Sequence, residues 1–339
     1  MPEEDVDLLQ KWLTFTQKIY STLEIDEAVR IALDVALQLT GMERGFVMTF
    51  DPSGELLFQA GRNIKGNVLE EHDFSGCTAA VQKVRDQREP FYFTWDPQEK
   101  PERSTRSGFC IPLFSYRINS ESKKMIGVLY ADSSQVIPFD HEEKEIVNVL
   151  AMHAGPALEN ALLYNIATRD PLTRLYQRHY FDSVALIEWR RTVRHKHPVS
   201  IVMLDLDGFK TFNDAYGWAE GDLALKRTAN ILREACRTED IIARYDQENF
   251  EILLPETDTA GAKKVAQRIL ENVPLLLTKE EEHPVTVSIG IATHPRCSVT
   301  SVQDLVKLAE IALNQAKQAG GNRISIYDPA LSKAHEKLF

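Results

Sequence analysis

The first residues whose types and spacing suggest chemistry are acids at the end of a short apolar segment. Residues 201–204 (Ile-Val-Met-Leu) predict a buried strand, and Asp205 and Asp207 follow it. Side chains two residues apart on a strand point to the same face. Paired carboxylates there suit a hard cation such as Mg²⁺, which brings phosphates with it. The backbone N–H of Phe209 and the charge of Lys210 suit a phosphate chain. A turn or a helix cap is the alternative interpretation of the two aspartates.

A second acidic group lies about forty residues further along. Residues 241–254 consist of two apolar runs around a polar insert that contains Asp246 and Glu248. This pattern predicts a hairpin with buried strands and a solvated tip. Two-residue hairpin loops favour glycine because their residues take positive φ, and this tip contains none. We therefore expect a longer turn, or a modified form of a tight one. A solvated turn with incidental acids is the alternative.

Together the two stretches resemble the GGDEF family of diguanylate cyclases. Four further motifs follow in the family's order. The matching segments are Arg169-Asp170-Pro171-Leu172-Thr173-Arg174-Leu175, Asp205-x-Asp207-x-Phe209-Lys210, Asn213 with Gly221-Asp222, the hairpin itself, Ser288-Ile289-Gly290-Ile291-Ala292, and Ala316-Lys317 with Asn322. The resemblance covers about residues 167 to 328.

The resemblance implies a GTP site in which two domains meet to form cyclic di-GMP. Asp222 also makes sense on its own, because a carboxylate can accept from both N–H groups on the edge of guanine, which adenine does not present. The implied metal ligands for Mg²⁺ are Asp205, Glu248 and the carbonyl of Leu206, the implied phosphate contacts are Phe209, Lys210 and Lys317, and the implied guanine contacts are Asn213 and Asp222.

The motif that names the family is altered. Where the family reads Arg-Tyr-Gly-Gly-(Asp/Glu)-Glu-Phe, residues 244–250 read Arg-Tyr-Asp-Gln-Glu-Asn-Phe. Asp246 and Gln247 replace the glycines, Asn249 replaces the fourth-position glutamate, and Glu248 is retained. A positive φ at a non-glycine residue would cost roughly 1–2 kcal/mol. A carboxylate about 4–5 Å from a phosphate would cost roughly 3–4 kcal/mol. Gly321 also stands where the family often has an arginine. We expect a degenerate cyclase that is inactive or very slow.

A second motif is intact. Five residues separate Arg237-x-x-Asp240 from Asp246, which is the position of the family's inhibitory site for cyclic di-GMP. Arginine binds phosphate and guanine bidentately, and aspartate accepts from guanine N–H groups. A surface ion pair is the alternative. Three functions stay open: a cyclic di-GMP receptor that signals to a downstream protein partner, an atypical active cyclase, and a pseudo-enzyme that binds GTP or only scaffolds a dimer.

The elements before this region indicate a separate sensor. In residues 5–22 the apolar residues recur with the period of a helix. Asp26 is expected to cap a second helix over 27–40. Two strands, over 46–50 and 55–60, are expected on either side of a turn. Residues 20 to 165 resemble a GAF domain through Thr40-Gly41-x-Glu43-Arg44-Gly45-Phe46, Met125-Ile126-Gly127-Val128-Leu129-Tyr130-Ala131-Asp132 and Ala157-Leu158-Glu159-Asn160-Ala161-x-Leu163-Tyr164. The resemblance implies a small-molecule pocket or a dimer module.

No chromophore of the GAF domain is identified. Cys77 and Cys110 do not match a bilin attachment site, and we expect both to be buried. The polar stretch 95–107 is a candidate lid over the pocket, or else a loose connection. Residues 141–168 predict a helix with Pro156 inside it. An interior proline usually kinks a helix, so this position is a candidate hinge, or else a static bend. The resemblance implies a homodimer through the GAF and linker helices.

Length and composition limit the number of domains, the kinds of partner and the location of the protein. The 339 residues suffice for two or three domains, and the net charge of −11 argues against nucleic acid or an anionic membrane as partner. The four cysteines are widely spaced, and no run reaches about 18 apolar residues, so we expect a cytoplasmic protein. The predicted fold class is α/β (α+β). We expect five segments: an N-terminal amphipathic helix (1–20), a GAF core with an antiparallel sheet (21–140), a terminal GAF and linker helix (141–168), a GGDEF domain with a ferredoxin-like cyclase palm core (169–330), and a tail (331–339).

Overall fold

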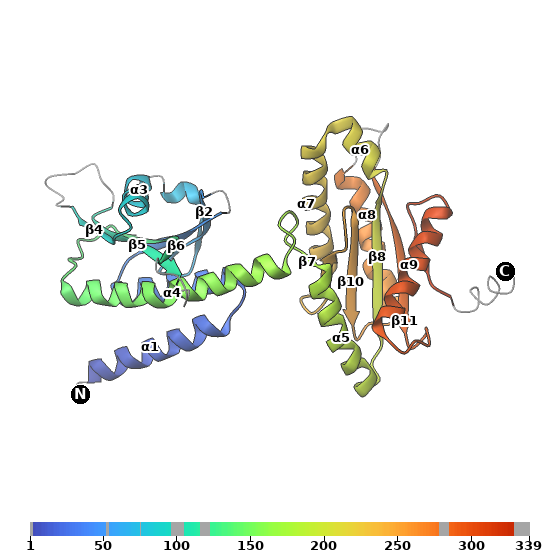
Figure 1. Ribbon diagram of the computed structural model, residues 1–339, viewed down its shortest axis with the longest axis horizontal. Helices are drawn as coiled ribbons and strands as arrows, with labels where there is room; N and C mark the ends of the chain where they lie inside the picture. The colour runs from blue at the N-terminus through green and yellow to red at the C-terminus, as the bar shows by residue number, and fades with distance from the viewer. Residues whose placement is uncertain are drawn as a thin grey trace. The chain divides into compact units, whose positions relative to one another are not determined.

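A computed structural model describes residues 3–51, 54–74, 76–95, 105–115, 123–277 and 285–328. The chain divides into two compact units, Met1–Ala167 and Thr168–Phe339, and each is described by itself. Figure 1 shows both units and labels many of their helices and strands.

The first unit is a six-stranded antiparallel sheet with helices on both faces. Its strands lie in the order β3-β2-β1-β6-β5-β4. The elements are α1 (Glu3–Ser21), α2 (Ile25–Thr40), β1 (Arg44–Phe50), β2 (Leu56–Asn63), β3 (Val68–Leu69), the 3₁₀ helix η1 (Glu71–Phe74), α3 (Thr78–Gln87), β4 (Phe91–Thr94), β5 (Ser107–Ser115), β6 (Lys124–Ser133) and α4 (His141–Thr168).

Apolar residues on both faces of this sheet hold the helices. Helices α1, α2 and α4 pack on one face, around residues such as Phe15, Leu33 and Leu158. Helix α3 and η1 pack on the other face, with Phe74 and Val84. The predicted helix boundaries are close, but Asp26 is not the cap of α2. The helix begins at Ile25, Glu24 is in the capping position, and no side chain makes a cap hydrogen bond. The burial of Ile25 against the core places this residue inside the helix instead.

The second unit is a mixed six-stranded sheet in the order β12-β11-β8-β10-β9-β7. Strands β8, β10, β11 and β9 pair antiparallel, whereas the outer pairs β11–β12 and β7–β9 are parallel. The elements are β7 (Tyr176–Gln177), α5 (Arg178–His195), β8 (Val199–Asp207), α6 (Phe209–Tyr216), α7 (Trp218–Ala235), β9 (Ile241–Arg244), β10 (Asn249–Pro255), α8 (Thr259–Leu277), β11 (Thr286–His294), α9 (Val302–Gln318) and β12 (Ile324–Ile326).

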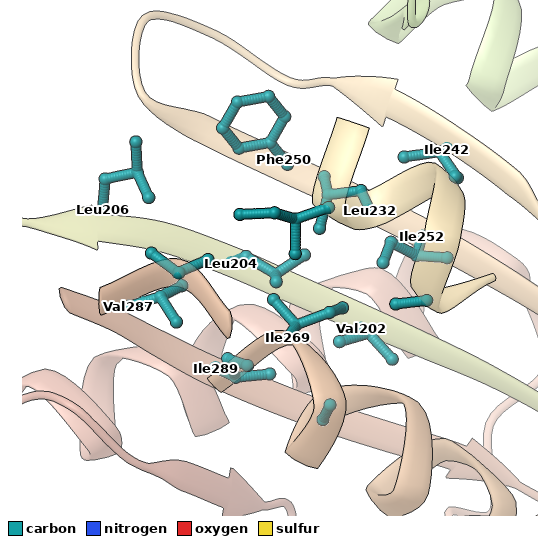
Figure 2. Packing of buried hydrophobic residues seen from close by; sticks show 14 of the residues in the cluster. Val202, Leu204, Leu206, Leu232, Ile242, Phe250, Ile252, Ile269, Val287 and Ile289 are labelled. Atoms are coloured by element: carbon teal, nitrogen blue, oxygen red, sulfur yellow. The ribbon is translucent and has the colours of Figure 1, made fainter. Parts of the chain in front are cut away.

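Successive side chains along the central strands point to opposite faces of the sheet, and each face carries a hydrophobic core. Figure 2 shows one of them, in which Val202 and Leu204 of β8 meet Phe250 of β10 and Leu232 of α7. Helices α6, α7 and α8 cover this face, and α5 and α9 cover the other. Because β8 is central, its last residues stand where the tip of the β9–β10 hairpin and the start of β11 meet. This is the edge at which the predicted site lies.

Several smaller expectations are settled by the structure. Cys77 and Cys110 are buried, as predicted, and all four cysteines are free thiols. Residues 96–104 of the predicted lid and the whole tail 331–339 lie outside the described residues. Within the described ranges, no helix has both the length and the apolar character needed to cross a membrane.

Candidate functional site

Asp205 is the buried acid at the end of β8. It lies between Asn249 of β10 and Ser288 of β11 in the sheet register, and the residue is 7% exposed. The Nζ of Lys317, from α9, lies 2.5 Å from its Oδ2. Burial raises the pKa of Asp205, Asp207 and Asp246 act in the same direction, and Lys317 opposes them. The sequence predicted Lys317 as a phosphate contact. In the structure this ammonium group pairs with Asp205, and its role as a phosphate contact stays a prediction.

Asp207 has a different role from Asp205, although the two share one strand. Its carboxylate accepts hydrogen bonds from Thr286 Oγ1 at 2.9 Å, from Ser288 Oγ at 2.7 Å and from the backbone N–H of Asn322 at 2.9 Å. A Cβ on Gly321 would come within 3.2 Å of its Cγ. Asp207 therefore anchors β11 and the turn after α9. The two acids are not an equivalent pair that is open to a cation.

The hairpin tip is the longer turn that the sequence allowed. Four residues, 245–248, join β9 to β10. Arg244 holds them: its Nη2 donates to the carbonyl of Gln247 at 2.6 Å, its Nε to the carbonyl of Asp246 at 3.1 Å, and its Nη1 to the carboxylate of Asp170 at 3.2 Å. Among the described residues, neither Asp246 nor Gln247 has a positive φ. The backbone strain considered from the sequence is therefore absent.

The tip gathers negative charge around Asp205. Burial raises the pKa of Glu248, and the carboxylates of Asp205 and Asp246 raise it further. Asn249 Nδ2 donates to Asp246 Oδ1 at 2.6 Å, so the residue that replaces the signature glutamate positions the new acid. No group of three or more His, Cys, Asp or Glu in the described ranges is arranged to hold a metal ion. A Mg²⁺ ion would have two carboxylates and the Leu206 carbonyl, an oxygen set that suits it, and would have to displace Lys317.

The predicted guanine contacts meet at the corner between α6 and α7. Asn213 is 8% exposed, and its Oδ1 has no hydrogen-bond partner. A Cβ on Gly221 would overlap that oxygen, so glycine is required for the close approach. Asp222 is the next residue of α7 and is exposed. Phe209 is buried in the core, and Lys210 is exposed beside it.

The Arg237-x-x-Asp240 turn borders a groove of about 610 Å³. Asp240 is 8% exposed, and its Oδ2 accepts from the backbone N–H of Arg237 at 2.7 Å. The side chain of Arg237 is 73% exposed and lies 3.8 Å from Glu239. Lys264 and Arg268 of α8 add two more cations to the lining. The groove is therefore concave, and its lining includes three cationic side chains and one fixed carboxylate.

Sequence comparison decides the family. Residues 24–158 match the GAF domain family, and residues 167–323 match the family described as "Diguanylate cyclase, GGDEF domain". The chain is a GAF domain followed by a GGDEF domain. Both the order and the approximate limits agree with the resemblances found in the sequence.

Two curated relatives and one solved structure are similar to this chain. "Diguanylate cyclase A" of Treponema denticola is 28% identical, and the alignment covers 98% of this chain and 92% of that protein. "Probable diguanylate cyclase DgcT" of Escherichia coli is 32% identical over 65% of this chain, which spans about half (48%) of that relative's length. The GGDEF domain of DgcB from Caulobacter crescentus, solved in complex with c-di-GMP, is 26% identical with a TM-score of 0.44, covering 48% of this chain and 93% of that one.

The GAF domain holds a pocket of its own, of about 300 Å³. Phe46, Phe58 and Phe74 line it together with Cys77. Burial raises the pKa of Cys77 to about 11, so its thiol is a poor nucleophile.

Three residues of the GGDEF domain with a bearing on function were missed from the sequence. Arg268 lines the groove, but it lies far from Arg237 in the sequence, and no motif connects the two residues. Trp218 is 79% exposed at the start of α7, directly after Gly217. The sequence alone did not show that this tryptophan lies near the corner formed by Asn213 and Asp222. Glu251 is fully buried and neither of its carboxylate oxygens has a hydrogen-bond partner. Its position in a strand of apolar residues was a visible anomaly.

Proposed function

We propose that this GGDEF domain acts as a receptor for cyclic di-GMP, which it binds in the groove beside Arg237 and Asp240. The observation that carries the proposal is the lining of that groove. Three cationic side chains, from Arg237, Lys264 and Arg268, face it together with one fixed carboxylate. The bound state would be passed to a downstream protein partner by a homodimer of the chain.

The turn is built to present its two polar groups differently. The N–H of Arg237 fixes the carboxylate of Asp240, while the guanidinium of Arg237 has only a loose ion pair at the surface. A fixed acceptor and an exposed guanidinium suit a ligand that offers N–H groups and phosphates at once. An ordinary surface ion pair would need neither the burial of Asp240 nor a groove next to it.

The chemistry of cyclic di-GMP fits this lining. Its two phosphates are anions that guanidinium groups bind bidentately, and the edge of guanine donates two N–H groups to a carboxylate. Leu254 and Val265, which are buried in the core, lie beneath the groove. The volume of about 610 Å³ lies in the range of small-molecule sites.

The hairpin tip supports binding without synthesis. The carboxylate of Asp246 is exposed beside Asp205 and Glu248, where the triphosphate of GTP would have to bind. At about 4–5 Å, one such repulsion costs roughly 3–4 kcal/mol, which is two to three decades in binding or rate. The ammonium group of Lys317 is also paired with Asp205, and a phosphate would have to compete with this carboxylate for it.

Calorimetric titration with cyclic di-GMP tests the proposal. The full chain, checked to be free of nucleotide, is compared with Arg237→Ala and with Arg194→Ala, which removes an exposed arginine on α5 away from the groove. We expect micromolar or tighter binding, weakened about 10- to 150-fold by Arg237→Ala because a hydrogen bond to a charged group contributes roughly 1.5–3 kcal/mol. Arg194→Ala should bind like the wild type. The proposal is wrong if the wild type does not bind, or if both variants bind equally.

An atypical cyclase is the second candidate, and the hydrogen bond between Asn249 and Asp246 favours it. This bond returns a carboxylate to the tip that lost its fourth-position glutamate. Incubation with GTP and Mg²⁺, followed by chromatography of the products, separates the two. The receptor proposal predicts no cyclic di-GMP. Product that disappears in Asp205→Ala would establish the cyclase instead.

A further inference from the structure

We propose that the outer face of α5 is the docking surface for an acidic amphipathic helix of a protein partner. The proposal rests on the receptor function above, because it names the surface through which such a receptor would engage its downstream protein. Helix α5 packs on the face of the sheet opposite to α8, which lines the Arg237 groove. A ligand in the groove and a helix on α5 would therefore not occupy the same surface.

The C-terminal half of α5 concentrates positive charge in an acidic chain. Residues 186–197 contain three arginines, one lysine and one glutamate, whereas the whole chain has a net charge of −11. The glutamate is paired with Arg191 at 2.8 Å, and Glu256 places a second negative charge near that arginine. Arg190 and Arg194 are exposed and make no ion pair within the part of the chain that the structure describes. Two guanidinium groups at this surface are thus not neutralised by the domain itself.

Aliphatic side chains share the outer face with these arginines. Leu186, Ile187 and Val193 are 39%, 56% and 56% exposed. Residues three and four apart on a helix are neighbours, so Arg190 lies between Leu186 and Val193, and Arg194 lies one turn further on. The opposite side of α5 is buried against the sheet. The outer face therefore offers aliphatic and cationic groups in alternation along one helix.

This alternation favours an acidic helix over other anionic partners. A helix that lies in a membrane surface gathers its apolar residues on one side and its cations on the other, whereas Arg190 stands among the aliphatic residues. The phosphates of a nucleic acid would use the arginines and leave Ile187 and Val193 in water. A partner helix with glutamates or aspartates between aliphatic residues would pair with the arginines and bury the aliphatic groups together. Arginine is also enriched in protein interfaces.

Fluorescence anisotropy with labelled peptides tests the proposal on the full chain. The probe is a synthetic helix of about four turns, with leucines three and four residues apart and glutamates between them. It should bind saturably, and its affinity should fall as salt is added, because exposed charges are screened. A second peptide with glutamines in place of the glutamates keeps the aliphatic side chains and should bind at least about 10-fold more weakly.

Matched variants place the peptide on α5. Arg194→Glu should raise the Kd of the acidic peptide at least about 10-fold, because like charges opposed across an interface repel. Lys226→Glu, at an exposed residue of α7, changes the net charge equally and should change the Kd less than about 2-fold. Ile187→Ser should raise the Kd about 3- to 10-fold through lost apolar contact. Val68→Ser, at a residue that is 72% exposed on β3 of the first unit, is its control and should bind like the wild type.

Calorimetry with cyclic di-GMP on the same variants separates this proposal from the receptor function. Arg194→Glu should bind cyclic di-GMP as the wild type does, which shows that the variant is folded and that only docking is lost. A wild type that binds the peptide as expected but does not bind cyclic di-GMP would support the docking surface and refute only the receptor function.

The docking proposal is overturned if the wild type does not bind the acidic peptide, if the glutamine peptide binds equally well, or if Arg194→Glu and Lys226→Glu behave alike. Flotation of the chain with phosphatidylglycerol vesicles, lost in Arg194→Glu, would also overturn it and would assign this face to a membrane.

Discussion

Replacing Glu251 by glutamine should remove a pH dependence from the stability of the second unit. Glu251 lies on β10 opposite Met203 and Ala243 and is fully buried, and both of its carboxylate oxygens lack partners. Burial raises its pKa to about 8, the negative charge of Asp182 adds to this, and Arg178 opposes it. The carboxyl group is therefore protonated in the folded state at neutral pH.

The size and sign of the effect follow from the two pKa values. In the unfolded chain the group titrates near 4.5, so between about pH 4.5 and 8 the folded state binds the extra proton. Stability then falls as the pH rises, by about 1.4 kcal/mol per pH unit. The full loss above pH 8 is about 5 kcal/mol, and about 3 kcal/mol is already lost at pH 7. Below pH 4.5 both states are protonated and the penalty vanishes.

Urea unfolding at pH 5.5 and pH 7.5 measures the effect. Between pH 5.5 and pH 7.5, the free energy of unfolding of the wild type should fall by about 2–3 kcal/mol more than that of Glu251→Gln. Glutamine keeps the size and removes the charge, and any offset from its own unpaired amide is the same at both pH values. Glu310→Gln, an exposed glutamate on α9, is the control and should follow the wild type. Parallel pH profiles for the wild type and Glu251→Gln would refute the reasoning.

Three further predictions concern the packing and charges of the same unit. Gly290→Ala should lower the free energy of unfolding by about 1–3 kcal/mol or more, because a Cβ would overlap the backbone of Leu313 on α9, and urea midpoints check it. Asp207→Ala should cost about 2–3 kcal/mol in the same assay, since three donors lose a charged acceptor; a loss below the error of the fit would contradict its anchoring role. Lys317→Met should raise the pKa of Asp205 further, because it removes the cation that lowers this pKa; carboxyl NMR titration measures it, and an unchanged pKa would contradict the ion pair.

The sequence predicted most of what local pattern controls. The buried strand before Asp205, the hairpin with its wet tip and the two-domain order are all present, because alternation and turn composition act within a few residues. The degeneracy of the signature can be read from the sequence, but its consequence for activity stays a prediction. The function of the Arg237-x-x-Asp240 turn stays a prediction too, although the groove beside it adds a physical basis.

What the sequence could not give are contacts between distant segments. The donors to Asp207 come from residues 286, 288 and 322, so spacing alone made Asp207 look like an equal partner of Asp205. The same holds for the ammonium group of Lys317, which comes from a helix more than a hundred residues further on. A carboxylate that looks unpaired in a short sequence motif is often hydrogen-bonded or ion-paired in the folded protein. Only the tertiary structure distinguishes an unpaired carboxylate from a paired one.

The tip shows how a signature can change while its scaffold persists. Glycines are needed in a tight turn for their positive φ, but this tip is a four-residue turn whose carbonyls are held by the guanidinium of Arg244, itself paired with Asp170. Its shape therefore does not depend on glycine, and Asp246 and Gln247 are accepted without strain. The electrostatics at the phosphate position change, whereas β9 still joins the tip to Asp240 at its other end. The proposed loss of synthesis and the proposed binding of cyclic di-GMP are thus physically separable, because they would depend on different ends of one strand.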